Sequence, residues 1–274
     1  MKGIVLYSKK DAKQNAWMIQ YLVNAFAENH IELECIYEEG LDAQNTPCDF
    51  VISRLRNADI SAVFEKRGIR VFNSSRVNRI ANDKYKAVQF VSMLGVRTMA
   101  STLYIPGASD NVYYPCILKS LDGHGGREVF LVHDNAELKN RVQQYPDKQF
   151  MLQKICSDIG IDYRAYVLDS QIIKVIRRSS DTDFRSNYSL GGKVIEIQDI
   201  PEEISQAVKT IASALRIDYA GIDFIVDHGH FVFNEIEDPV GARMLYEATD
   251  YDILSAFVQL IIRKMSDGHS FQSL

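Results

Sequence analysis

Four carboxylate residues stand in a stretch of sequence that otherwise predicts a buried pair of strands. Asp223 follows Ile222 in "GIDFIV", and Glu235, Glu237 and Asp238 lie in "FVFNEIED". The surrounding residues are the aliphatic and aromatic types that pack a sheet. A carboxylate inside a buried sheet is costly unless a cation or hydrogen-bond donors compensate its charge. The pattern therefore raises the question of what lies opposite these side chains.

The length of the turn decides which of these side chains share a face. A two-residue turn of sequence HG would place Asp223 opposite Asn234 and send Glu235 to the other face. A three-residue turn, HGH at 228–230, would place Asp223 opposite Glu235. We favour the longer turn, because HG is not a preferred two-residue turn and the longer turn separates two kinds of face. The carboxylate face would hold Asp223, Glu235 and Glu237 with Ile225 and Phe233, and the core face would hold Ile222, Phe224, Val226, Val232 and Ile236.

Three acidic side chains on one face repel one another, and a divalent cation would resolve that repulsion. Ligands that are all oxygens suit Mg²⁺ or Mn²⁺. We therefore expect Asp223, Glu235 and Glu237 to bind a metal ion. From the hairpin alone, a face that is simply solvated explains the pattern equally well.

A glycine-rich loop is predicted between two strands in "ILKSLDGHGGREVFLV". Lys119 ends the first strand, and Gly123, Gly125 and Gly126 follow it. Glycines let backbone N–H groups approach a phosphate, and a lysine supplies a point charge for it. The loop has neither the GK[ST] ending nor the following helix of a Walker or Rossmann loop. A plain turn is the alternative for this loop taken alone.

A tract of arginines and amides, "IRRSSDTDFRSNYSLGG", is the third candidate. Arg177, Arg178 and Arg185 lie within nine positions, followed by Ser186 and Asn187. Guanidinium and amide groups suit a polyphosphate or a carboxylate substrate. Taken alone, the tract is better explained as a solvated loop.

Composition limits the classes of function. The chain has 274 residues, of which 46% are hydrophobic, so it can bury a sizeable core. Its net charge of −5 does not favour binding to nucleic acid or to an anionic membrane. The apolar run at the N-terminus is too short for a signal peptide, and no segment has the length of a membrane span. The four scattered cysteines are typical of reduced thiols, so we expect a cytoplasmic protein.

The predicted elements give an α/β fold with α+β character in the C-terminal half. Residues 1–75 alternate short apolar strands with segments of helical spacing, which is typical of a small parallel α/β unit. Strands dominate from Tyr163 onward. Further helices are predicted to begin near Asn82 or Asp83 and to cover 201–216 and 250–265.

In this order, the motifs resemble the ATP-grasp superfamily, and most closely the RimK-type glutamate ligases. "NDKYKAVQFVSMLGV" looks like the helix whose early lysine reaches the nucleotide phosphates, and "KSLDGHGG" looks like the loop that covers them. "MLQKI" is similar to the hinge strand at the adenine, and "DYRAYVL", "DFRSNYSLGG", "GIDF" and "FNEIE" match the remaining motifs. The resemblance implies nucleotide contacts from Lys84, Lys119, Gly123, Gly125, Gly126, Lys154, Ile155, Asp162, Arg185, Ser186 and Asn187 and metal binding by Asp223, Glu235 and Glu237.

The resemblance also implies an architecture and a reaction. We expect an N-terminal α/β domain (1–80), a central ATP-grasp subdomain (81–155) and a C-terminal subdomain (156–274) that clasp ATP with one or two Mg²⁺ or Mn²⁺ ions. The γ-phosphate would pass to a carboxylate, and an amine would attack the acyl phosphate to give an amide, ADP and phosphate. Arg185 and Asn187 would steady the phosphoryl group, and Arg178 would steady the acyl phosphate or the substrate carboxylate.

The sequence departs from the family pattern at several positions. Glu237 stands where the third metal ligand is usually Asn, Lys154 where the hinge usually has Glu, and Glu128 where the loop often has Gly. A segment "DPVGARMLYEATDYDI" replaces the usual small-residue loop after Glu237. Substrate choice can therefore differ from that of the family.

Several arginines indicate an anionic substrate. Arg54 and Arg56 end a predicted parallel strand, where open α/β sheets place ligands. With Arg164, Arg177, Arg178 and Arg243 approaching from the other side, we expect an acidic amino acid or a peptide carboxylate, with Arg54 among its ligands. The alternative is that Arg54 and Arg56 are surface residues paired with nearby acids.

Two other functions stay open beside the ligase. One is a regulatory ATP-binding module of the same fold that does not turn over. The other is a kinase-like transferase, for which the sequence shows no clear base. The expected partners are small-molecule or peptide carboxylates and amines, without nucleic acid or membrane, and assembly into a homo-oligomer is left open.

Overall fold

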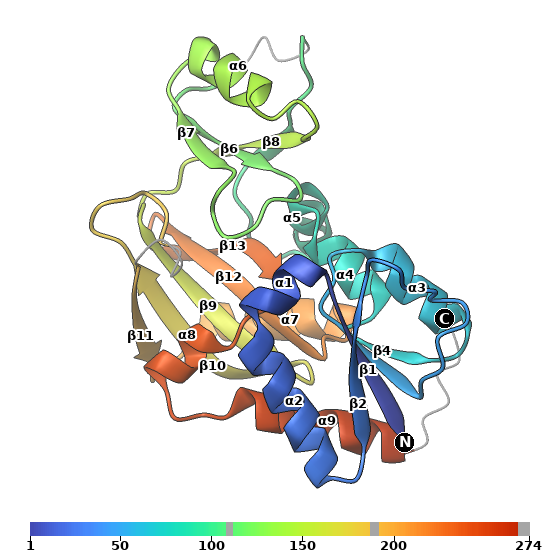
Figure 1. Cartoon of the computed structure of the whole chain (residues 1–274). Coiled ribbons are helices and arrows are strands. Elements are labelled where there is room, and N and C mark those ends of the chain that lie inside the picture. Colours follow the sequence, from blue (N-terminus) through green and yellow to red (C-terminus); the bar gives the residue numbers. More distant parts are fainter. Residues whose placement is uncertain (108–111, 187–191, 268–274) are drawn as a thin grey trace.

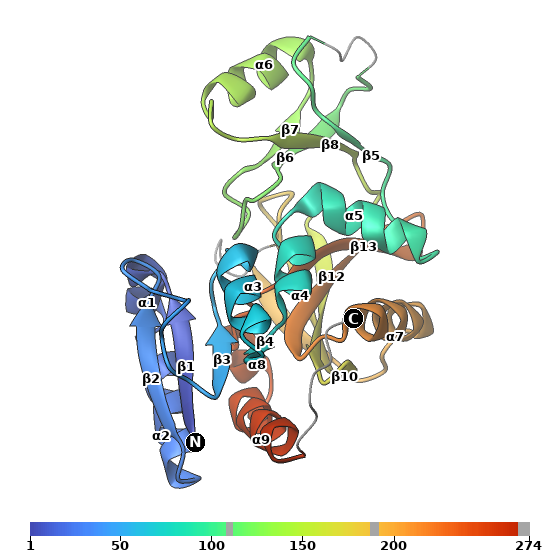
Figure 2. The same cartoon turned by 90° about the vertical axis from the view of Figure 1, so that its right-hand side faces the viewer.

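The chain folds around three separate sheets (Figure 1). The structure is a computed structural model, and it describes residues 1–107, 112–186 and 192–267. Seen from the side, the N-terminal sheet stands beside the C-terminal sheet, and the central sheet lies above them (Figure 2). Parallel and antiparallel strands covered by helices confirm the predicted α/β class with α+β character in the C-terminal half.

The N-terminal sheet is parallel, with strand order β2-β1-β3-β4. Its strands and the helices around it are β1 (Lys2–Tyr7), α1 (Lys9–Gln14), α2 (Ala16–Glu28), β2 (Glu32–Tyr37), β3 (Phe50–Ser53), α3 (Ala58–Lys66), β4 (Arg70–Phe72) and α4 (Ser75–Ala81). Helix α2 buries Met18, Leu22 and Phe26, which recur every fourth residue and so lie on one side of the helix. The small parallel α/β unit is therefore confirmed.

The central sheet is antiparallel and has the order β5-β8-β6-β7. Its elements are β5 (Ser101–Leu103), β6 (Cys116–Ser120), β7 (Val129–Val132), α6 (Asn135–Gln143) and β8 (Phe150–Lys154). The glycine-rich loop joins β6 to β7, as the sequence predicted. Its position at the end of a hairpin points it away from α6 and toward the C-terminal sheet (Figure 1).

The C-terminal sheet has the order β11-β10-β9-β12-β13. Its elements are β9 (Ile161–Leu168), β10 (Gln171–Ser179), β11 (Lys193–Ile197), α7 (Glu202–Leu215), β12 (Tyr219–Asp227), β13 (His230–Glu237), α8 (Arg243–Ala248) and α9 (Ile253–Ser266). Alternate residues of β9 enter different cores: Ala165 and Val167 pack with α7, whereas Tyr166 and Leu168 pack with α2 and α9. The sheet is therefore covered on both faces.

Helix α5 (Lys84–Met93) connects the central and C-terminal parts. Asp83 caps it by accepting a hydrogen bond from the backbone of Lys86, in agreement with the predicted start. Although 81–155 was predicted as one subdomain, α5 packs mainly on β13. The boundaries 1–80, 81–155 and 156–274 stay a prediction.

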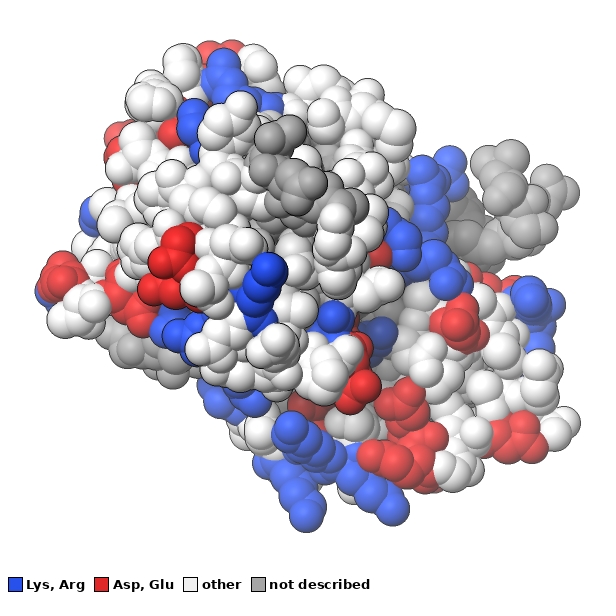
Figure 3. Space-filling model, turned by 90° about the horizontal axis from the view of Figure 1, so that it is seen from above, with Lys and Arg blue, Asp and Glu red and all other residues white. Residues whose placement is uncertain are grey.

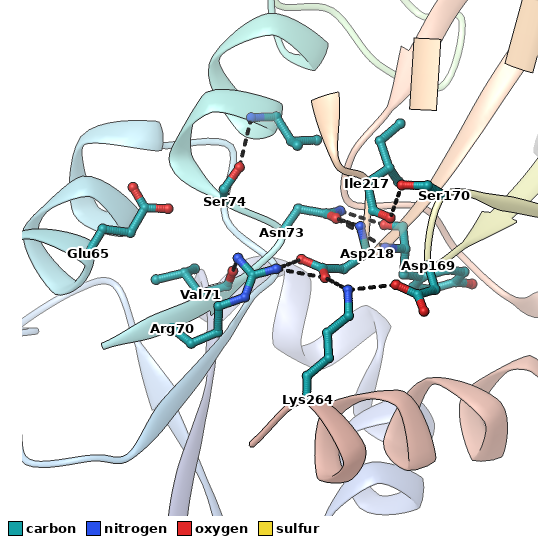
Figure 4. A network of polar contacts seen from close by, with 12 residues as sticks. Glu65, Arg70, Val71, Asn73, Ser74, Asp169, Ser170, Ile217, Asp218 and Lys264 are labelled. Carbon is teal, nitrogen blue, oxygen red and sulfur yellow. Dashed lines mark hydrogen bonds and ion pairs between the residues drawn. The ribbon is translucent and has the colours of Figure 1, made fainter. Parts of the chain in front are cut away.

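A sealed network of charges fastens β4 to the start of β12 and to α9 (Figure 4). The buried carboxylate of Asp218 accepts two hydrogen bonds from Arg70, at 2.7 and 2.6 Å, and one from Lys264 at 2.8 Å. The side chain of Asn73 accepts hydrogen bonds from the backbone N–H groups of Asp218 and Tyr219 and donates one to the carbonyl of Tyr219. This network holds the N-terminal sheet against the C-terminal one.

The surface seen from above carries both signs of charge. Basic and acidic patches lie side by side there, and neither sign covers the face alone (Figure 3). Within the described ranges, no helix combines the length and the hydropathy needed to cross a membrane.

Candidate active site

The hairpin of β12 and β13 brings the predicted carboxylates together by a route that differs from the predicted one. Asp223 lies opposite Glu235, as expected. However, the turn has two residues, His228 and Gly229, with positive φ values of 50° and 80°. The three-residue turn is therefore wrong, and a bulge at Asn234 restores the pairing instead.

The bulge also changes the face of the residue that precedes it. Phe233 was predicted to accompany the carboxylates, but it lies opposite Phe224 and is fully buried in the core beside α7. The ring of Phe233 therefore stabilises the sheet on the face that packs against α7. Asn234, the additional residue of β13, lines a pocket on the other side.

Asp223 is buried behind two arginines. Its carboxylate accepts two hydrogen bonds from Arg164 and one from Arg178, at 2.7, 2.7 and 2.6 Å. Burial would raise the pKa of Asp223, but the two guanidinium groups outweigh burial and lower it to about 2. Arg178 also binds Asp162. Burial raises the pKa of Asp162 above its usual range although Arg178 opposes that effect.

Glu235 and Glu237 are more open than Asp223. Glu235 lies 2.9 Å from the Nζ atom of Lys84, and Glu237 pairs with Arg164. In each pair the recorded contact uses the Oε2 atom, and within the described ranges no hydrogen bond or ion pair uses Oε1. Both side chains line a pocket, so each has one carboxylate oxygen available to a ligand.

The described residues contain no group of three His, Cys, Asp or Glu side chains placed to bind a metal ion. The open oxygens of Glu235 and Glu237 fit Mg²⁺, which usually completes its coordination with water and phosphate. Asp223 would first have to release an arginine. Its role as a third ligand stays a prediction.

The first pocket lies between the central and C-terminal sheets, and predicted nucleotide residues from distant segments meet in it. Lys119 comes from β6, Lys84 from α5, and Lys154 and Ile155 from the end of β8. All the predicted nucleotide residues that the structure describes line it, namely Lys84, Lys119, Gly123, Gly125, Gly126, Lys154, Ile155, Asp162, Arg185 and Ser186. Asn187 lies outside the described residues.

Lys119 is the most buried cation of this pocket. Its Nζ atom donates a hydrogen bond to the Oδ1 atom of Asn234 at 2.7 Å. Burial lowers the pKa of Lys119 to about 8, although the nearby charge of Glu235 opposes that effect. An additional negative charge in the pocket would therefore meet a cation that lacks its hydration shell.

The glycine-rich loop needs its glycines for two reasons. A Cβ atom on Gly123 would lie 2.3 Å from the Oγ atom of Ser120, which is closer than any real contact allows. Gly125 and Gly126 have φ values of 65° and 72°, in the left-handed region. Arg185 reaches across from the C-terminal part and donates a hydrogen bond to the carbonyl of Gly126 at 2.8 Å. The loop is thus tied to both walls of the pocket.

A second pocket adjoins the first one. It shares Lys84, Gly123, His124, Gly125 and Glu235 with the first pocket. Its other lining residues come from the N-terminal part, from the residues before α5, from the start of the glycine-rich loop and from the end of β13, namely Arg56, Ala81, Asn82, Leu121, Asp122, Ile236, Glu237 and Asp238. His124, Asn82 and Asn234 were not among the predicted site residues, although "DGHGG" and the extra residue in "FNE" were visible signals.

The family model of the RimK-like ATP-grasp domain matches residues 62–261. The chain belongs to the RimK-like ATP-grasp family. The predicted resemblance and fold are therefore confirmed. The chain is also 29% identical to an uncharacterised protein of Mycoplasma pneumoniae over 249 residues. These aligned residues make up 89% of this chain and 86% of that protein.

Other ATP-grasp proteins extend this comparison. A probable alpha-L-glutamate ligase of Legionella pneumophila is 24% identical over 221 residues, or 76% of this chain and 72% of that protein. A D-alanine–D-alanine ligase of Bacillus anthracis, solved with ATP, has a TM-score of 0.76 at 17% identity and covers 97% of this chain and 98% of its own. The ATP-grasp ligase PsnB, solved with a precursor variant, Mg and ADP, has a TM-score of 0.68 at 16% identity, with coverages of 96% and 98%.

In this ATP-grasp chain, three arginines predicted to bind substrate, Arg54, Arg164 and Arg243, are not among the described residues that line the two pockets. Arg54 is buried and donates a hydrogen bond to the carbonyl of Val240 at 2.5 Å. Arg164 holds Asp223, and the side chain of Arg243 donates to the carbonyl of Gln14. Their direct contact with a substrate stays a prediction that this geometry does not support.

Two more arginines, Arg178 and Arg56, differ in whether they line a pocket. Arg178, predicted to contact the acyl phosphate, lies behind the pocket wall between Asp162 and Asp223. Arg56 does line the second pocket, where it lies 3.4 Å from Asp11. Of the two neighbouring arginines at the end of β3, the one that faces the candidate site is therefore Arg56 and not Arg54.

Proposed function

We propose that this ATP-grasp chain is an ATP-dependent carboxylate–amine ligase. It would form an amide or peptide bond through an acyl phosphate and release ADP and phosphate. The observation that carries the proposal is the convergence in one pocket of the ten described residues predicted to bind nucleotide, from segments as far apart in the sequence as α5 and the residues that follow β10.

The first pocket contains the kinds of group that would bind the adenine and the phosphates of ATP. The backbone around Lys154 and Ile155 would meet the adenine, whereas Lys119, Lys84 and the glycine-rich loop would meet the phosphates. Bound Mg²⁺ would neutralise phosphate charge, with Glu235 and Glu237 as its protein ligands. The guanidinium of Arg185 donates hydrogen bonds to Asp183 and to the carbonyl of Gly126, and by exchanging one of these partners it could stabilise the phosphoryl group in transfer.

The second pocket would take the other substrate. It shares a wall with the first pocket, so a carboxylate placed there would face the γ-phosphate. Lys84 lies 2.9 Å from Glu235, whereas the contact of Arg56 with Asp11 is longer, at 3.4 Å, so Arg56 is the cation better placed to bind an additional acidic group. We infer an acidic amino acid or a peptide carboxylate. The probable glutamate ligase activity of a relative makes L-glutamate the first compound to test.

The proposed ligase would act on small-molecule or peptide substrates in the cytoplasm. The main competitor is a module of the same fold that binds ATP without turnover. Nothing in the described pocket favours that competitor, because Lys84, Lys119, Arg185 and the open carboxylates are all present.

One experiment separates the two functions. ADP release by the full chain would be measured with Mg-ATP alone and after addition of single amino acids or short peptides, beginning with L-glutamate. We expect stimulated ADP release with an amide product visible by mass spectrometry. Tight ATP binding without stimulation by any compound of such a panel would instead support the silent module.

A further inference from the structure

The cations around the first pocket differ in what neutralises them. Lys84 lies 2.9 Å from the carboxylate of Glu235, and Arg185 is held by Asp183 at 2.7 Å. Lys119 is more deeply buried than either, yet within the described residues its recorded hydrogen bond goes only to the neutral amide of Asn234. A buried ammonium without a carboxylate partner is unusual, because ions inside proteins are normally paired.

Asn234 owes its position to an irregularity of the fold. It is the bulged residue of β13, between Phe233 opposite Phe224 and Glu235 opposite Asp223. Bulges redirect side chains next to functional sites. Here the bulge lets Phe233 stay in the core while Asn234 lines the pocket and reaches Lys119 across from β6.

We propose that Asn234 is a positioning residue, which holds the ammonium of Lys119 at the phosphate end of the pocket without neutralising it. An aspartate in this place would also hold Lys119, but it would compete with the phosphates for the same cation. The amide orients the lysine and leaves its charge for the nucleotide. This inference rests on the proposed binding of ATP in the first pocket.

The charged groups around Lys119 come from every side of the pocket. Glu235 of β13 and Asp162 of β9 favour the ammonium, as does the thiol of Cys156 when ionised, and Lys84 of α5 disfavours it. Burial is the largest influence and brings the pKa of Lys119 to about 8. The free protein therefore loses this proton as the pH rises through about 8, whereas bound phosphate retains it.

The test is the pH profile of ADP binding in the absence of metal ions, with EDTA present. The phosphates of ADP are already ionised above pH 7, so the ligand itself does not titrate there. For the wild-type chain we expect the dissociation constant to rise above pH 8, by up to about tenfold per pH unit. Below pH 8 the affinity should be nearly constant.

The decisive variant is Asn234→Asp. A carboxylate beside Lys119 should move the onset of the affinity loss upward by about one pH unit or more, and it should weaken ADP binding at pH 7. Asn234→Ala should weaken binding and move the onset downward, because the ammonium loses its hydrogen-bond partner. Asn24→Asp adds the same charge on the exposed face of α2 and should leave the profile unchanged.

Two results would overturn the proposal. One is an Asn234→Asp profile that coincides with the wild-type profile, and the other is a wild-type affinity that does not change between pH 7 and 9.5. If ADP binds the wild-type chain at no pH, the proposed function fails. In that case the pKa of Lys119 would be measured by NMR in the free wild-type and Asn234→Asp proteins. The proposed role of Asn234 predicts a higher pKa of Lys119 in the variant.

Discussion

Two clusters of charge in this molecule use the same residue types and differ in how completely they are satisfied. Around Asp218, two cations converge on one carboxylate, and each carboxylate oxygen has a protein partner within 2.8 Å. Around Glu235, one lysine meets one carboxylate oxygen and the other oxygen is open to a pocket. The cluster around Asp218, the sealed cluster, joins parts of the fold. The cluster around Glu235, the open cluster, is arranged to accept a ligand.

The difference shows that a buried charged group indicates a binding site only when one of its polar atoms has no partner in the protein. The pair of Asp223 with Arg164 and Arg178 belongs with the sealed kind in this structure, although it lies on the same strand face as Glu235. A carboxylate in a buried strand therefore occurs in both kinds of cluster. The open oxygens, and not the burial, separate binding from support.

The largest expected effect comes from the open cluster. Glu235→Gln keeps the shape of the side chain but removes the charge that would bind Mg²⁺, so ADP formation should fall at least about 100-fold, since a metal contributes several kcal/mol to charge stabilisation. The folded state should persist. Glu32→Gln, an exposed change on β2, is the control. Normal turnover by Glu235→Gln would show that the metal assignment is wrong.

The sealed cluster should respond in stability instead. Asp218→Ala leaves Arg70 and Lys264 without the carboxylate between them, and removal of one partner of a buried ion pair costs about 3 kcal/mol at the lower end of the usual range. We use the lower end because the side chain of Lys264 keeps 25% of its surface exposed. Chemical denaturation measures the loss.

Activity per folded molecule should stay nearly unchanged in Asp218→Ala. Asp169→Asn removes the charge of a more exposed partner of Lys264 and keeps a residue type that tolerates the positive φ of this position, so it should cost less than about 1 kcal/mol. Equal losses of stability in the two variants would contradict the distinction between the sealed and the exposed contact.

Lys119 should contribute to affinity and not to the fold. Lys119→Met removes a charge-assisted contact to phosphate, for which about 1.5–3 kcal/mol is typical, so ADP affinity at pH 7 should fall by about tenfold or more. Lys119→Arg should retain much of the affinity and should remove the loss above pH 8, because arginine does not deprotonate there. Lys10→Met, on the exposed surface of α1, is the control for charge.

The smallest effect separates two neighbouring arginines. Arg56→Ala should raise KM for the non-nucleotide substrate several-fold and leave KM for ATP unchanged, the pattern of lost substrate binding. Arg54→Ala should mainly lower stability, since Arg54 is buried and supports the carbonyl of Val240. A reversed pattern would restore the original expectation for Arg54.

The sequence predicted the parts of this protein that depend on local pattern. The parallel N-terminal unit, the strand–loop–strand around Gly123 and the helix start at Asp83 follow from periodicity, turn residues and capping, and all are present. The pairing of Asp223 with Glu235 was also predicted. The turn that produces this pairing was not, because HG adopts positive φ at both residues and a bulge corrects the register.

Features that depend on tertiary contacts could not be predicted. Whether Arg54 or Arg56 faces the pocket depends on how the segment after β3 packs against Val240, which lies far along the chain. The role of Asn234 depends on Lys119, more than a hundred residues away. Sequence spacing gives neither contact.

The most direct test of the account is amide hydrogen exchange with and without Mg-ATP. We predict slower exchange in the glycine-rich loop at 121–128 and around the hinge at 153–156, where the first pocket would be filled, and unchanged exchange around Arg70 and Asp218 in the sealed cluster. Glycines supply few packing contacts, so the loop has the most protection to gain. Unchanged exchange in the loop, or protection spread equally over both clusters, would contradict the claim that the open cluster is a nucleotide site.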